Sequence, residues 1–115
     1  MPAVLTLLSP IVSATPGGEG TTTVRVKNTG AVVDQFAVNL LGEAGAWGVV
    51  DPPFVSLFPG AEETVTVRFH PPRSSTVAAG GIPFGVRITS KEEPDFSLVE
   101  EGSVQVTGFS SVTAK

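Results

Sequence analysis

The chain contains one stretch twice, and this stretch decides the predicted fold. Residues 10–25 have the sequence PIVSATPGGEGTTTVR, and residues 53–68 have the sequence PFVSLFPGAEETVTVR. Aligned at an offset of 43 residues without gaps, the two copies are identical at ten of their sixteen positions. Each copy begins with a short apolar segment, continues with Pro-Gly and ends in alternating β-branched and polar residues, which is typical of a hairpin. We therefore predict two similar β-hairpins.

The rest of the chain continues the pattern of short strands and turns. No window has the three- and four-residue apolar spacing of a helix. Strands are predicted at 4–8 (resumed at 11–14), 21–28, 33–41, 54–58, 63–70, 82–90 and 96–109. Their spacing indicates an all-β sandwich of seven to eight strands, with no significant helix. Parallel strand pairs are not expected, because the chain offers no helical crossover between strands.

Length and composition fit one domain. The chain has 115 residues, of which 41% are hydrophobic and 16% charged, which suits a two-layer core. We assign residues 1–109 to the sandwich and residues 110–115 to a tail or the start of a linker. The net charge of −4, with seven Lys and Arg in all, disfavours nucleic acid as a partner. No segment approaches the roughly 20 apolar residues of a membrane helix, so we expect no membrane insertion by this segment.

Two features concern the compartment. Cysteine is absent, so the fold has no disulfide and no thiolate metal site. The start, residues 1–8, is apolar but lacks the basic region that opens a signal peptide. The lack of cysteine leaves the compartment open, and the lack of a signal peptide favours the cytoplasm. We expect the chain to be the N-terminal domain of a longer protein.

The order of the motifs carries a family resemblance. Pro16-Gly17 is followed by Val24-Arg-Val-Lys-Asn28-Thr-Gly30, Phe36-x-Val38, Trp47, Leu57-Phe-Pro59-Gly60 and Val65-x-Val67-x-Phe69-x-Pro71. This order resembles bacterial immunoglobulin-like add-on domains, such as those beside α-galactosidases and in bacterial adhesion proteins. It is more distantly similar to hydin-like and major-sperm-protein-like domains. The resemblance covers about residues 9–109 and implies an immunoglobulin-like sandwich without catalytic residues.

In such a sandwich, strand 21–28 pairs antiparallel with strand 63–70. The two repeated hairpins would then lie side by side in one sheet, related by an approximate two-fold axis. Val24 and Val67 would face the core. Arg25 and Arg68 would emerge near each other on the outer face.

Residues that could support catalysis are scarce. The chain has one histidine, no cysteine and no tyrosine. His70 is expected on an outward strand position, without a second histidine for a metal site. The carboxylate doublets, such as Glu100-Glu101, point to opposite faces of a strand and cannot act as a catalytic pair. We predict no catalytic, cofactor-binding or metal-binding residues, and a solvated acidic edge within residues 92–101 that discourages strand-edge aggregation.

Four residues are candidates for binding a partner. Arg25, Lys27 and Arg68 form a predicted cationic patch, which is either an ordinary solvated surface or a docking face for an acidic partner. Such a partner could be the acidic edge of a second copy, giving weak self-association. Arg87 is a further basic residue that could join the patch. Trp47 either plugs one end of the core or stacks on a sugar ring.

These observations predict a non-catalytic structural or protein-interaction module that binds a protein partner, or other domains of its own polypeptide, through a sheet face or loops. The alternative is a carbohydrate-binding or cell-adhesion module of a secreted or surface protein. Exposure of Trp47 would favour the alternative.

Overall fold

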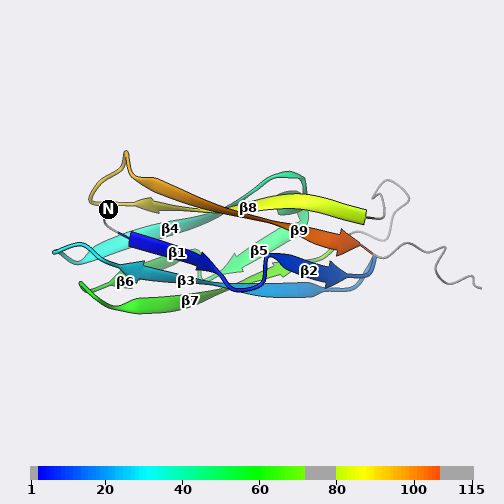
Figure 1. The fold of residues 1–115 in the computed structure, drawn as a ribbon, viewed down its shortest axis with the longest axis horizontal. Coiled ribbons are helices and arrows are strands. Elements are labelled where there is room, and N and C mark those ends of the chain that lie inside the picture. Colours follow the sequence, from blue (N-terminus) through cyan, green and yellow to red (C-terminus); the bar gives the residue numbers. More distant parts are fainter. Residues whose placement is uncertain (1–2, 72–79, 107–115) are drawn as a thin grey trace, which may run out of the picture.

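The structure, a computed structural model, describes residues 3–71 and 80–106 and consists of two packed β-sheets (Figure 1). The elements are β1 (Ala3–Leu7), β2 (Ile11–Ala14), β3 (Gly20–Asn28), β4 (Asp34–Leu41), the 3-10 helix η1 (Glu43–Trp47), β5 (Gly48–Asp51), β6 (Phe54–Leu57), β7 (Glu62–Phe69), β8 (Gly80–Ser90) and β9 (Ser97–Val106). One sheet has four strands in the order β1-β3-β7-β5, and the other has five in the order β2-β9-β8-β4-β6.

The core lies between the sheets and is formed by alternate residues of every long strand. Val24 and Val67 are fully buried, as predicted, together with Phe36 and Ile88. The prediction of an all-β sandwich is confirmed, and the described residues contain no α-helix. They also contain no helix long and apolar enough to cross a membrane. Residues 110–115, predicted as a tail, lie outside the described residues.

The described residues form nine strands, more than the seven to eight predicted. The first predicted segment breaks at Ser9-Pro10 into β1 and β2, which belong to different sheets. The second difference is β5, at residues 48–51, which was not predicted as a strand; Pro52-Pro53 separates it from β6. Proline cannot donate a ladder hydrogen bond, so a strand pairing stops there and the chain can change sheets.

The prediction of two hairpins is wrong. In each copy of the repeat the first strand lies in the five-stranded sheet and the second in the four-stranded sheet, so the Pro-Gly turn crosses between sheets. The reason is that both edges of β3 are occupied, by β1 and β7, and those of β7 by β3 and β5. No edge remains on which β2 or β6 could form a hairpin.

The repeat instead belongs to two similar units of three strands, β1-β2-β3 and β5-β6-β7. The two units are related by an approximate two-fold axis. β3 and β7 pair antiparallel, as predicted, and Thr23 lies opposite Thr66, its own counterpart in the repeat. The pairing of Leu5 with Val26 between β1 and β3 recurs, 43 residues later, as the pairing of Gly48 with Phe69 between β5 and β7. Of the four strands that the repeat contains, β3 and β7 lie side by side in the four-stranded sheet. The other two, β2 and β6, lie at opposite edges of the five-stranded sheet.

The expectation that no strands pair in parallel is also wrong. β2 pairs parallel to β9, with Ile11 opposite Ser103 and Ala14 opposite Val106. A parallel pair needs a long crossover connection, which is usually a helix. Here the connection is the rest of the domain, because β2 and β9 come from opposite ends of the chain.

The buried polar side chain of Asn28 anchors loops to the strands. The Asn28 amide nitrogen donates to the carbonyl oxygens of Val32 and Leu57, both at 2.9 Å, and its side-chain oxygen accepts from the Gly30 amide at 2.8 Å. The connections that follow β3 and β6 are thereby joined at the same end of the molecule.

Candidate functional site

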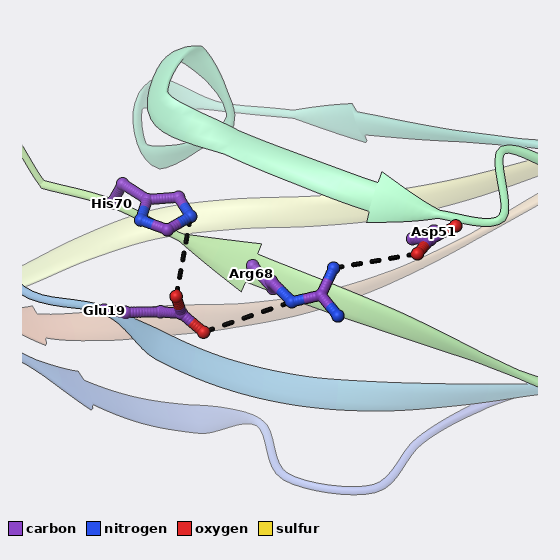
Figure 2. Close-up of polar contacts among 4 residues, drawn as sticks. All are labelled: Glu19, Asp51, Arg68 and His70. Atoms are coloured by element: carbon purple, nitrogen blue, oxygen red, sulfur yellow. Dashed lines mark ion pairs between the residues drawn. The ribbon is translucent and has the colours of Figure 1, made fainter.

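The outer face of the four-stranded sheet carries the predicted basic residues, but each arginine there has an acidic neighbour. Arg68 Nη1 lies 3.7 Å from Asp51 Oδ2, and Arg68 Nε lies 4.0 Å from Glu19 Oε2 (Figure 2). Glu19 also lies 3.8 Å from His70 Nε2. Arg25 Nε lies 3.8 Å from Glu62 Oε2 on β7. The face therefore carries interleaved charges of both signs.

Arg25 and Arg68 share this face without being adjacent. Arg25 pairs with Thr64 across the strands, and Arg68 pairs with Thr21. The two arginines therefore lie on either side of the Thr23–Thr66 pair, about 13 Å apart along the strands. Lys27 lies further along β3, opposite Glu62.

Trp47 closes one end of the core. It is the last residue of the 3-10 helix η1, is half-buried, and packs edge-on against Phe69 with ring centroids 6.0 Å apart. Its carbonyl oxygen accepts a hydrogen bond from the His70 amide at 2.8 Å. Phe69 in turn packs against Phe84 at 4.7 Å, so Trp47 is continuous with the aromatic part of the core.

The acidic residues Glu100 and Glu101 lie on an exposed strand edge. β2 pairs only with Ser103–Val106 of β9, so residues 97–102 have a partner strand on the β8 side alone. In the described part of the chain, no group of three His, Asp or Glu side chains could hold a metal ion.

The outer face of the five-stranded sheet carries a shallow groove, which we call the Gly85 groove. It has a volume of about 270 Å³ and is lined by Leu41, Gly42, Pro83, Phe84, Gly85, Val99, Glu101 and Gly102. The floor of the groove is at Gly85, where glycine has no side chain. A Cβ there would lie 3.3 Å from Val99 Cγ1 and 3.6 Å from Leu41 Cβ and would fill the floor. Apart from Glu101, the lining side chains are apolar.

Arg87 lies two residues beyond Gly85 on β8 and is opposite Asn39 and Val99 on the neighbouring strands. Its side chain is partly buried, and its Nε is buried without a hydrogen-bond partner in the part of the chain that the structure describes. No described carboxylate lies within ion-pair distance of it, in contrast to Arg25 and Arg68. Arg87 therefore does not join the predicted basic patch, because it lies on the opposite sheet.

The sequence contained one signal for this surface. Gly85 interrupts the outward positions of an otherwise alternating strand, and glycine inside a strand often marks a close approach of a ligand or another backbone. The lack of an acidic neighbour for Arg87 depends on strand register, which the sequence pattern did not define.

The fold is that of immunoglobulin-like sandwich domains of the PapD-like and MSP-like type. A FixG-related protein from Vibrio parahaemolyticus has this fold with a TM-score of 0.72 and 13% identity, over 92% of this chain and 97% of that one. An MSP-domain protein of Caenorhabditis elegans, SSP-19, has a TM-score of 0.60 and 13% identity, over 87% of this chain and 98% of that one. No family model matches the chain, and no curated protein matches it in sequence.

Longer proteins also contain the fold. The Salmonella enterica SafB chaperone, solved in complex with the SafA pilin, has a TM-score of 0.57 and 13% identity, over 92% of this chain and 55% of that structure. A family 123 glycoside hydrolase from Clostridium perfringens has a TM-score of 0.71 and 8% identity, but the chain covers only 28% of it. At these identities the likeness shows the fold alone.

Proposed function

We propose that the domain is a non-catalytic protein-interaction module that binds its partner through the outer face of the five-stranded sheet. The observation that carries this proposal is the half-buried Arg87, which has no described carboxylate within ion-pair distance and lies on the same face as the apolar Gly85 groove. A carboxylate of a bound partner would supply the charged acceptor that this guanidinium group lacks. The opposite face offers no such group, since its arginines already have acidic neighbours.

The chemistry of the surface defines the partner. A guanidinium group binds a carboxylate through two parallel hydrogen bonds, and the bond is stronger where water is excluded. The groove accepts an apolar side chain next to that carboxylate. We therefore expect a protein segment with an Asp or Glu close to an apolar residue. The net charge of −4 opposes a strongly acidic partner, so a single carboxylate suits the site better than an acidic surface.

The fold is compatible with this function. Similar sandwiches occur in chaperones, including SafB, which was solved with its pilin. We propose that this chain likewise serves protein contacts, either with a separate protein or with other domains of its own polypeptide.

Substitution of Arg87 tests the proposal. Proteins captured by the wild-type domain should be compared by quantitative mass spectrometry with those captured by R87Q and by G85A. R87Q removes the charge, and G85A fills the floor of the groove, so both should lower capture of the specific partner about tenfold or more, the effect of losing a charged hydrogen bond. R25Q is the matched control, because it removes a cation from the other sheet. Equal loss in R25Q and R87Q, or loss in neither, would contradict the proposal.

A second candidate surface is the face that carries Arg25, Lys27 and Arg68, with Trp47 at its end. Lys27 is exposed there and could attract an acidic partner. The carboxylates of Glu19 and Glu62 compete for the same cations, so this face is the weaker candidate. A carbohydrate-binding role through Trp47 gains no support from its edge-on packing against Phe69.

A further inference from the structure

The edge strand β6 has unused backbone hydrogen-bonding groups. β6 is the outermost strand of the five-stranded sheet, and it pairs only with β4. The Val38 amide donates to the Pro53 carbonyl oxygen at 2.8 Å, which fixes the phase of the antiparallel ladder. In such a ladder alternate residues face the partner strand, so Val55 and Leu57 bond toward β4. The amide and carbonyl groups of Phe54 and Ser56 therefore point toward the free edge.

The sequence of this edge is nearly the same in both directions. Residues 54–58 read FVSLF, with Ser56 at the centre, branched aliphatic residues beside it and a phenylalanine at each end. Val55 and Leu57 are buried in the core, whereas Phe54 is 56% exposed and Phe58 is 73% exposed. Phe54 and Ser56 lie on the same side of β6. Phe58 follows the strand directly, and its carbonyl oxygen accepts from the Ala61 amide at 2.9 Å. Continuing the alternation places the Phe58 side chain on the side of Phe54 and Ser56.

This edge lacks the charges that two other exposed edges carry, although the edge strands β1 and β2 are uncharged as well. The exposed half of β9 carries Glu100 and Glu101, and the edge strand β5 ends in Asp51. Charged residues on an edge strand oppose pairing with another chain. Residues 54–58 contain no charge, so nothing in this segment opposes the approach of a second strand.

We propose that β6 pairs antiparallel with β6 of a second copy of this chain, around a two-fold axis at Ser56. The pairing joins the two five-stranded sheets into one continuous sheet of ten strands. Ser56 then lies opposite Ser56 of the second copy, and Phe54 lies opposite Phe58 of the second copy on both sides of the axis. Aromatic residues directly opposite each other are favourable cross-strand pairs. This surface is distinct from the Gly85 groove, so the inference does not depend on the proposed function.

The dimer is weak and depends on concentration. Pro53 and Pro59 flank the paired segment and cannot donate hydrogen bonds, which limits the ladder to five residues. So short a contact is smaller than the interfaces of stable complexes. Association should therefore be measured by sedimentation velocity on the full chain, from about 10 µM to about 1 mM, the range of weak affinities.

Charge substitutions at Ser56 test the two-fold axis directly. In a dimer of S56K alone or of S56E alone, two like charges lie directly opposite each other, which is unfavourable. The dissociation constant of each variant alone should therefore be at least about tenfold higher than that of the wild type. A mixture of S56K and S56E should associate again, because the opposite charges now face each other. Ser56 is exposed, and the mixture shows that both variants are folded if association returns.

T64K is the matched control, since Thr64 is an exposed strand residue of the other sheet. T64K should associate as the wild type does, and so should R87Q, which tests the proposed function separately. A wild-type chain that stays monomeric at the highest concentration would overturn the inference. Failure of the S56K and S56E mixture to associate, or an equal loss in T64K, would overturn it as well.

Discussion

A single buried carboxylate organises one end of the sandwich. Asp34 begins β4 and is buried, and its side chain accepts hydrogen bonds from the Ser90 hydroxyl, the Gln35 amide and the Glu92 amide. The Ser90 hydroxyl oxygen in turn accepts from the Glu93 amide at 2.9 Å. Asp34 therefore fixes the connection between β8 and β9, which is far from it in the sequence.

We predict that D34A destabilises the domain by about 3 kcal/mol, because it leaves the buried Ser90 hydroxyl and two amides without their acceptor. Urea unfolding followed by circular dichroism measures this change. D95A is the control, since Asp95 is exposed in the same connection, and it should change the free energy of unfolding by no more than about 0.5 kcal/mol. Equal effects of the two substitutions would show that the network around Asp34 contributes nothing specific.

At the scale of the elements, the sequence predicted every described strand except β5, but not which sheet each short strand joins. Alternating residues predicted the buried faces of β3 and β7 and their antiparallel pairing, and the structure confirms both. The Pro-Gly turns were correctly located but wrongly interpreted as hairpin turns. A strand of four residues, such as β2 or β6, has the same pattern in either sheet, and only competition for edges decides its place.

The candidate site was less accessible to sequence reasoning than the fold. The pattern placed Arg25 and Arg68 outward, but not the carboxylates that approach them, because those contacts join residues distant in sequence. The distinctive property of Arg87, an unpaired buried Nε, arises from its neighbours across two strands. Such a property requires strand register, and local patterning leaves the register of short strands undefined.

The turns between the sheets depend on glycine at equivalent places in the repeat. Gly17 has φ 78° and Gly60 has φ 84°, in the region that favours glycine. A Cβ at Gly60 would meet no atom within 4 Å, so G60A tests backbone strain alone. We predict a loss of about 1 kcal/mol in the free energy of unfolding for G60A. G81A serves as the control, because Gly81 does not have a positive φ. If urea unfolding showed a larger loss in the free energy of unfolding for G81A than for G60A, this explanation would be refuted.

At the scale of the whole molecule, residues 3–14 hold the two sheets together. β1 forms an edge of the four-stranded sheet, and β2 forms an edge of the five-stranded sheet beside β9 (Figure 1). Together they contribute the buried residues Ala3, Leu5, Val12 and Ala14 to the core. One short segment thus completes both layers and joins the two ends of the described chain.

We predict that a variant lacking residues 1–14 does not fold cooperatively, because it loses four buried side chains and uncovers the edges of β3 and β9. Every strand contributes to one core, so we expect the truncation to lower the free energy of unfolding by more than the net stability of a typical domain, which is about 5–15 kcal/mol. Urea unfolding followed by Trp47 fluorescence measures it, since Trp47 is half-buried and packs against the core. A synthetic peptide of residues 1–14 should restore a cooperative transition, and a peptide with L5D and V12D should not, because both side chains are buried. A truncated variant that unfolds cooperatively without the peptide would show that seven strands suffice, and that β1 and β2 only cover a sandwich that is already complete.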